Sequence, residues 1–359
     1  MFRKKRHRRK PYYRPMVEQL EIRLMLTSNT HIAFGTDAGQ EARVRVYDQD
    51  TGLLTADLTP FPGFMGGARV ALGDVDPTNA GDEVIVAAGP GGGPHVCVFS
   101  VTGTLLGETF VFGAAFAGGV YVTTGNINGD ATDEVIVGAG PGGGPHVRSF
   151  DFDSGGGGFT QDAGPLGSFF AYAAGFSGGV RVGSGASLAG STGTNDEIVT
   201  GPGPGGGPNI KILDGDDGSL LNDFFAFNPA FTGGVYVSIG AADGLGPQVQ
   251  VGAGEGGGPH LIVYDGDFGT GGAPTEFMSV FLLRPSLPVG VRPGTLVNLG
   301  VASDVDTTGG DPNNGYAFGA GANNAVRFLD TDDNDPLNDL NNFWFNPFPD
   351  LDDTGVFIS

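Results

Sequence analysis

Short loops rich in Asp and Asn hold the residues of this chain that are best suited to chemistry. The clearest, "GNINGDATDEV", places Asn126, Asn128, Asp130, Asp133 and Glu134 in one turn. Alternate side chains of such a loop point into one hollow, and a carboxylate a few residues later can close it. Hard cations such as Ca²⁺ take six to eight oxygen ligands from loops of this kind. The loop therefore predicts a calcium site, which we expect to be structural and not catalytic.

Two further loops, "GDVDPTNAGDEV" and "SDVDTTGGDPNNG", offer looser versions of the same pattern. Their candidate ligands are Asp74, Asp76, Asp82 and Glu83 in the first loop and Asp304, Asp306 and Asp311 in the second. The corresponding loops at 185–197 and 240–248 have lost most acidic groups. The alternative interpretation of all these acids is a set of solvated loops in an acidic protein.

The acidic loops belong to a unit that repeats along the chain. A glycine-rich joint of the form "GPGGGPHV" recurs at Gly93, Gly144, Gly207 and Gly258, spaced 51, 63 and 51 residues apart. It alternates with an aromatic residue, Gly-Gly and a short strand, as in "FAGGVYV" and "FSGGVRV". Two weaker copies of the joint and two of the Gly-Gly motif bring the number of repeats to six. Repetition at this period indicates an array of supersecondary units.

Each unit has the pattern of four short strands. In the third unit they are expected at 118–125, 133–140, 145–151 and 168–173. Four antiparallel strands repeated radially predict an all-β fold, a six-bladed β-propeller. The chain enters at a second strand (31–35) and ends on a lone first strand (355–359), so we expect the C-terminal strand to close the ring on the first blade. The expected blades are 355–359 plus 31–62, 66–113, 118–174, 178–228, 233–283 and 289–347.

The unit "GGVYVTTGNINGDATDEVIVGAG" resembles the FG-GAP/VCBS repeat of integrin α-chain propellers and many bacterial surface proteins. The resemblance covers residues 30–359, roughly, and implies that Asn126, Asn128 and Asp130 are the first three ligands of a calcium loop. It places the final ligand on Asp133 or Glu134, and the spacing to the next glycine favours Glu134. It also matches Asp74 and Asp76 to the first two positions of the other loop. The sequence departs from the family at Ala131, where glycine is usual, and in a count of six instead of seven.

The glycine-rich joint itself is interpreted as a turn between two strands. It lacks the Lys-Ser/Thr pair and the following helix of a phosphate-binding loop, and the nine-residue period of a calcium β-roll is absent. Its histidines, at positions 95, 146 and 260, recur once per unit and are expected to satisfy local backbone groups instead of binding metal. Cys97, the single cysteine, is interpreted as one variant of a strand position that otherwise holds Arg or Lys, as at Arg148.

The charge is divided between a basic tail and an acidic body. Residues 1–28 hold nine Lys/Arg and two acids, which leaves 18 − 9 = 9 basic and 40 − 2 = 38 acidic residues for the rest. Such a body repels nucleic acid, and no apolar run reaches the ~18 residues of a membrane span. We predict a disordered tail over 1–28 and a propeller domain over 29–359. "LEIRLML" (20–26) resembles the LEPR-x-L-L sorting element of planctomycete surface proteins, with Ile22 in place of Pro, and implies an exported or cell-surface protein.

Three classes of function compete on this scaffold. The first, which we predict, is a monomeric, non-enzymatic binding or adhesion module for protein or glycan. The second is a lectin-like propeller, which would repeat aromatic and carboxylate or Asn pairs at the blade junctions; "FFAFNPAF" (224–231) and "FWFNPF" (343–348) have this character. The third is a carbohydrate-active enzyme, against which stands the lack of a nucleophile–base pairing in the sequence.

Overall fold

The computed structural model describes residues 31–49, 51–185, 188, 193–240, 247–266, 268 and 274–281 with their side chains, and the backbone of 291–297, 314–320, 326–330, 343–345 and 356–358. These residues form 25 β-strands and no α-helix. No helix in this part of the chain has the length and apolar character needed to cross a membrane. The predicted tail, the sorting element at 20–26 and the candidate ligands Asp304, Asp306 and Asp311 lie outside the described residues.

The strands are grouped into antiparallel sheets in chain order. The first sheet contains β25 (Val356–Ile358), β1 (His31–Thr36), β2 (Val44–Asp48) and β3 (Leu54–Leu58). The second contains β4 (Ala68–Gly73), β5 (Glu83–Ala88), β6 (His95–Ser100) and β7 (Leu105–Phe110). The third contains β8 (Val120–Gly125), β9 (Glu134–Ala139), β10 (His146–Asp153), β11 (Gly158–Gln161) and β12 (Ser168–Phe170).

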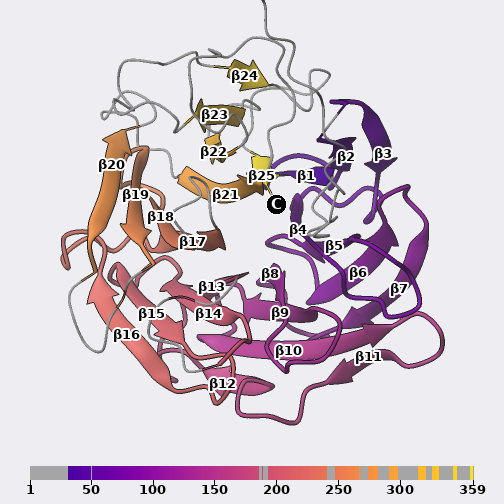
Figure 1. Cartoon of the computed structure of the whole chain (residues 1–359), viewed down its shortest axis with the longest axis horizontal. Coiled ribbons are helices and arrows are strands. Elements are labelled where there is room, and N and C mark those ends of the chain that lie inside the picture. The colour runs from indigo at the N-terminus through magenta and orange to yellow at the C-terminus, as the bar shows by residue number, and fades with distance from the viewer. Residues whose placement is uncertain are drawn as a thin grey trace, which may run out of the picture.

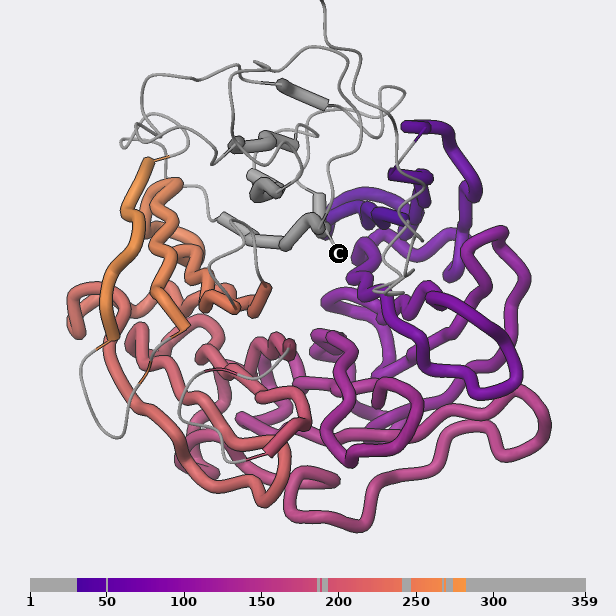
Figure 2. Tube along the Cα trace, viewed as in Figure 1, coloured from indigo at the N-terminus to yellow at the C-terminus, as the bar shows by residue number. Residues whose placement is uncertain are grey.

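The series continues in the same order. The fourth sheet contains β13 (Val180–Gly185), β14 (Glu197–Pro202), β15 (Asn209–Leu213) and β16 (Leu220–Phe225), and the fifth contains β17 (Val235–Gly240), β18 (Gln248–Ala253), β19 (His260–Asp265) and β20 (Glu276–Phe281). Strands β21 (Val291–Val297), β22 (Asn314–Ala320), β23 (Val326–Asp330) and β24 (Phe343–Phe345) pair in order as a further sheet. Figures 1 and 2 show the sheets as radial blades, with the trace running from the indigo first blade to the orange fifth.

The predicted all-β propeller fold is confirmed, but the prediction of six equal four-stranded blades is wrong. The structure shows five blades and not six; strands β21 to β24 pair with one another, and only their backbone is described. The third blade also carries five strands instead of four. Its long β10 pairs with β12 through His146–Arg148 and with β11 through Phe150–Asp153, because the insertion after Asp153 folds back as an extra hairpin.

The two ends of the described chain meet in the first blade. β25 pairs antiparallel with β1, and the partners are Phe34 with Ile358, Gly35 with Phe357 and Thr36 with Val356. The predicted closure of the ring by the C-terminal strand is therefore confirmed. Pairing of this kind leaves the inner edge of the first blade covered.

The hydrophobic core lies between facing blades. The second strands β5, β9, β14 and β18 are buried at all six positions, as expected for strands covered on both faces. Each core cluster joins residues of consecutive blades. One of them packs Val44 and Val46 of the first blade against Val70, Val84 and Cys97 of the second. A blade is thus stable only beside its neighbours.

The glycine-rich joint and the Gly-Gly motif of each blade contact each other through their backbones. A Cβ on Gly140, at the start of the joint, would lie 2.1 Å from the carbonyl oxygen of Gly118, and Gly89, Gly203 and Gly254 meet the same obstacle at 1.9, 1.9 and 2.1 Å. The N–H of Gly142, whose φ is +90°, donates to the carbonyl of Ser177 in the next blade at 2.8 Å. Glycine is therefore required both for close approach and for a left-handed turn, as the sequence predicts.

We predict that Gly140→Ala lowers the free energy of unfolding by about 2 kcal/mol, because the new methyl group must push two backbone segments apart. Gly113→Ala is the matched control, since Gly113 is exposed and a Cβ there meets nothing within 4 Å. Chemical denaturation of both variants measures the difference. Equal free energies of unfolding for the two variants would show that the close backbone contact at Gly140 does not require glycine.

Candidate metal centre

The loop 126–134, between β8 and β9, is folded by its own polar side chains. Asn126 Oδ1 accepts the N–H of Gly129 at 2.8 Å, and Asn128 Oδ1 accepts the N–H of Asp130 at 2.9 Å. Asp130 Oδ1 in turn accepts the N–H of Thr132 at 2.8 Å. These are turns in which a side-chain oxygen replaces a backbone acceptor. The amide oxygens that the sequence predicts as calcium ligands are therefore engaged inside the loop.

Glu134 is the most unusual acid of this loop. It is the first residue of β9, it is 0% exposed, and its Oε2 accepts the N–H of Ile127 at 2.7 Å. Its Oε1 is buried without a hydrogen-bond partner. Burial, and then the negative charges of Asp162, Asp130 and Asp151, raise the pKa of Glu134 to about 8. A buried carboxylate oxygen with no donor is costly, and a cation beside it would remove that cost.

Other carboxylates gather around Glu134. Ligand atoms of Asp130, Glu134 and Asp151, the last on β10, all lie within 4.8 Å of one another. Asp162, just after β11, has a buried Oδ2 without a hydrogen-bond partner, and burial and the charge of Asp151 raise its pKa to about 6. Asn128 Nδ2 donates to Asp151 Oδ1 at 3.1 Å. We call Asp130, Glu134, Asp151 and Asp162 the carboxylate cluster.

The structure thus brings two predicted ligands together and adds two that sequence reasoning missed. Asp151 could have been predicted from the repeat. In most units the third strand ends in Asp, and the second strand begins with an acidic or amide residue. Strand pairing sets such residues opposite each other, as the register of Gln248 with Asp265 shows. Asp162 carried no signal, because it lies beyond the extra hairpin of the third blade.

Asp133 does not belong to this cluster. Its N–H donates to the carbonyl of Asp74 in the preceding blade at 2.8 Å, and burial, then the charges of Asp196 and Asp74, raise its pKa to about 7. The next blade repeats the link, because the N–H of Asp196 donates to the carbonyl of Asn126 at 2.7 Å. The aspartates before the buried Glu134 and Glu197 therefore join consecutive blades.

In the second predicted loop, 74–83, hydrogen bonds satisfy the carboxylates of Glu83 and Asp76. Glu83 is 0% exposed; its Oε2 accepts the N–H groups of Val75 and Asp76, both at 3.1 Å, and its Oε1 accepts Asn79 Nδ2 at 2.6 Å. Asp76 accepts the N–H of Thr78 at 3.1 Å and the hydroxyl of Ser154. Asp82 is also buried, at 7% exposure. Within the described residues this loop forms no group of three clustered carboxylates, so it suits a cation less well than the carboxylate cluster does.

The recurrent histidines lie at the junctions between blades. His95, His146 and His260 stack on Phe110, Phe170 and Phe281 of their own blades, with ring centroids 4.8, 4.7 and 4.2 Å apart. A second phenylalanine from the preceding connection tilts against each of them: Phe61, Phe112 and Phe227, at 5.2, 5.3 and 5.1 Å. Each imidazole is therefore held between two aromatic rings.

The hydrogen-bond partners of these imidazoles correct the sequence prediction. In the described residues the Nε2 atoms lie near side chains of the outer strand, not backbone groups: Glu108 at 3.1 Å, Ser168 at 2.8 Å and Ser279 at 2.9 Å. Asn209 takes the same place in the fourth blade and donates to Asp223 Oδ1 at 2.5 Å. Each of these partners comes two residues before an exposed phenylalanine.

Four exposed phenylalanines therefore mark the ends of the outer strands β7, β12, β16 and β20, and Figure 1 shows these strands on the periphery of the ring. Phe110, Phe170, Phe225 and Phe281 are 54%, 54%, 53% and 44% exposed; we call them the rim phenylalanines. They occupy the same position in four consecutive blades.

The innermost strands, in contrast, meet around a buried set of aromatic and basic residues. Their second positions hold Arg69, Tyr121, Arg181 and Tyr236 in consecutive blades, all less than 10% exposed. The guanidinium carbon of Arg69 lies 3.7 Å from the ring centroid of Tyr121, and that of Arg181 lies 3.6 Å from that of Tyr236. Stacking of this kind stabilises a buried cation, so these residues have a structural explanation.

No protein-family model and no curated protein sequence matches the chain. Similar solved structures include the Dos1 propeller, with 15% identity, 88% of this chain and 67% of that chain covered, and a TM-score of 0.39. The WD40 domain of SCAP from fission yeast has 11% identity, 86% and 69% coverage and a TM-score of 0.38. A Bacillus licheniformis rhamnogalacturonan lyase has 14% identity, 84% and 63% coverage and a TM-score of 0.39. The likenesses extend to fold alone, and the propeller architecture rests on the strand topology.

Proposed function

We propose that this protein is a non-enzymatic binding module whose rim phenylalanines stack on the sugar rings of a glycan. The observation that carries the proposal is the repetition of one arrangement in four consecutive blades. Each copy has an exposed phenylalanine and, two residues earlier on the same face of the strand, a polar side chain. These polar residues are Glu108, Ser168, Asp223 and Ser279.

The arrangement suits a sugar because a sugar ring has an apolar C–H face and a polar edge. The phenylalanine offers an apolar surface, and the neighbouring carboxylate or hydroxyl can bond a sugar hydroxyl. In three blades the imidazole stack also fixes the phenylalanine ring, as at His146 and Phe170. A ring that is already held loses little conformational entropy on binding.

Repetition favours a polymeric glycan over a single protein partner. A protein interface needs one contiguous patch, whereas the rim phenylalanines are distributed over four blades. Weak equivalent sites spaced around a ring gain from a ligand that repeats, because the second contact becomes intramolecular. The formal charge of −22 disfavours anionic polymers, including nucleic acid, so the ligand class is an uncharged polysaccharide bound by a monomer.

Calcium is proposed as a structural ion at the carboxylate cluster. Two buried carboxylate oxygens there, Glu134 Oε1 and Asp162 Oδ2, have no donor, and Asp130 and Asp151 complete a set of oxygen ligands. This donor set matches a hard cation. When bound, the ion would tie loop 126–134 to β10 and to the extra hairpin of the third blade.

Export to the cell surface is the compartment that we propose for this module. It is supported by the resemblance of residues 20–26 to a sorting element and by the glycan-binding role itself. Fractionation of cells that produce the full chain tests it. Recovery of the protein in the cytoplasm alone would contradict it.

The glycan proposal predicts retention of the protein on uncharged polysaccharides such as cellulose, chitin or β-glucans. Replacing all four rim phenylalanines by alanine should abolish it, with a loss of avidity on the order of 10²-fold or more. Phe277→Ala is the matched control, because Phe277 lies on β20 and is 44% exposed but is not a rim phenylalanine. Affinity electrophoresis and a glycan array measure binding. Absence of any glycan ligand, or undiminished binding by the fourfold variant, contradicts the proposal.

The calcium proposal predicts uptake of Ca²⁺ in titration calorimetry and a higher melting temperature, reversed by chelator. At a hundredfold excess over Kd the gain is about 2.7 kcal/mol. Glu134→Gln should remove the uptake, whereas Glu83→Gln, which alters an equivalent buried acid outside the cluster, should keep it. If calcium gives no heat and chelator leaves melting unchanged, the cluster is not a calcium site.

A further inference from the structure

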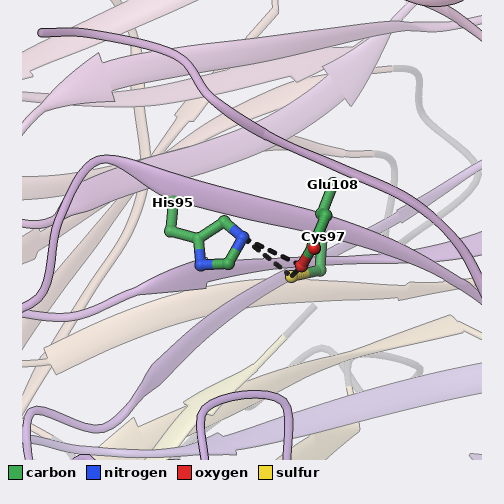
Figure 3. A group of neighbouring side chains, drawn as sticks. All are labelled: His95, Cys97 and Glu108. Atoms are coloured by element: carbon green, nitrogen blue, oxygen red, sulfur yellow. Dashed lines mark hydrogen bonds and ion pairs between the residues drawn. The ribbon is translucent and has the colours of Figure 1, made fainter. Parts of the chain in front are cut away.

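The second blade contains a set of donor atoms found in none of the other described blades. His95 and Cys97 lie on β6 and Glu108 on β7, and their side chains converge in Figure 3. His95 Nε2 lies 3.1 Å from Glu108 Oε2, Cys97 Sγ lies 3.7 Å from His95 Nε2, and Cys97 Sγ lies 3.8 Å from Glu108 Oε2. One nitrogen, one sulfur and one oxygen therefore form a small triangle.

The three distances are close to those between three ligand atoms of a tetrahedral zinc ion. With ordinary bond lengths to zinc, tetrahedral geometry puts sulfur about 3.6 Å from nitrogen or oxygen, and nitrogen about 3.3 Å from oxygen. The observed separations differ from these by about 0.2 Å. Three protein ligands with a fourth position open to solvent are a common arrangement for zinc.

The register of the other blades shows how this set differs from the repeated arrangement. The position of Cys97 holds Arg45 in the first blade, Arg148 in the third and Lys211 in the fourth. In the first blade that cation forms a salt bridge with the acid opposite, Arg45 Nε with Asp57 Oδ2 at 3.0 Å. In the second blade the acid opposite, Glu108, is kept, but the fixed cation is replaced by a thiol. A bound cation would restore the missing positive charge.

Burial and packing prepare the three ligands. Cys97 is 1% exposed, whereas the side chains of His95 and Glu108 are 23% and 56% exposed, so the thiol forms the floor of the site and solvent reaches its outer side. Phe110 and Phe61 hold the imidazole on its two sides. Support of this kind orients a ligand before metal arrives and raises affinity.

We propose that His95 Nε2, Cys97 Sγ and Glu108 Oε2 bind one Zn²⁺ ion, with water at the fourth position. The thiol gives its proton to solvent when the metal binds, so the charges of thiolate and carboxylate balance that of the ion. Sulfur and imidazole select a borderline-soft metal over Ca²⁺ or Mg²⁺, which separates this site from the carboxylate cluster. A nucleophilic role for Cys97 is disfavoured, because the residue is only 1% exposed.

Cobalt substitution of the metal-free full chain tests the proposal directly. A thiolate–Co²⁺ charge-transfer band in the near ultraviolet reports the site without ambiguity, because the chain has one cysteine. We expect one equivalent of Co²⁺ to produce this band together with the strong visible bands of tetrahedral cobalt, and Zn²⁺ to displace it. Cys97→Ser should remove the band, and His95→Gln and Glu108→Gln should each weaken Co²⁺ affinity by roughly tenfold or more.

His146→Gln serves as the matched control, because His146 occupies the same place in the third blade but has Arg148 where the thiol would be. It should leave the cobalt spectrum and affinity unchanged. Glu108→Gln alters an exposed side chain, so it remains informative even if the buried Cys97→Ser variant does not fold. A wild-type protein without a thiolate band at saturating Co²⁺ overturns the proposal, and so does a band whose affinity is unaffected by both His95→Gln and Glu108→Gln.

Discussion

Close contact between glycine backbones is the constraint on which this ring depends. Each joint docks against the Gly-Gly turn of its own blade, where the N–H of Gly140 donates to the carbonyl of Gly119 at 2.9 Å. The Gly-Gly turn of the following blade packs against the same joint: a Cβ on Gly179 would lie 2.6 Å from the carbonyl oxygen of Ala139. No side chain fits between these segments. Backbone atoms therefore set how closely consecutive blades approach at these turns, and glycine permits that approach.

Because the backbone sets the geometry, side chains at repeated positions can diverge. The first position of the second strand keeps a buried acid in three blades: Glu83, Glu134 and Glu197 are each 0% exposed. Their surroundings differ, since Glu83 is satisfied by three donors whereas Glu134 faces other carboxylates. The position of Cys97 diverges in the same way between arginine, lysine and thiol. The proposed calcium and zinc sites are thus local variants of one scaffold, and the rim phenylalanines are shared by the second to fifth blades.

The sequence predicted the strands, the glycine turns and the closure by the C-terminal strand, because local patterns and repetition determine them. It did not predict the extra hairpin of the third blade, since an insertion after Asp153 reads as a loop. That hairpin brings Ser154 to Asp76 in the preceding blade and Asp162 to the carboxylate cluster. The sequence prediction also placed Asp133 among the calcium ligands, because the sequence does not show that this residue contacts Asp74 in the preceding blade. The prediction of six blades rested on counting repeated sequence marks, whereas the structure shows five blades, and the third of them has an extra strand.

The dependence of the ring on its glycine contacts is tested most directly by hydrogen exchange at single amides. The N–H groups of Gly91, Gly142 and Gly205 donate across blade boundaries to Ala117, Ser177 and Thr232 at 2.9, 2.8 and 2.8 Å. If these contacts hold the blades together, the three amides exchange as slowly as those of the buried strands β5, β9 and β14, through opening of the whole ring. Exchange of these glycine amides much faster than the buried strands would show that each blade is stable without its neighbour and would contradict the account.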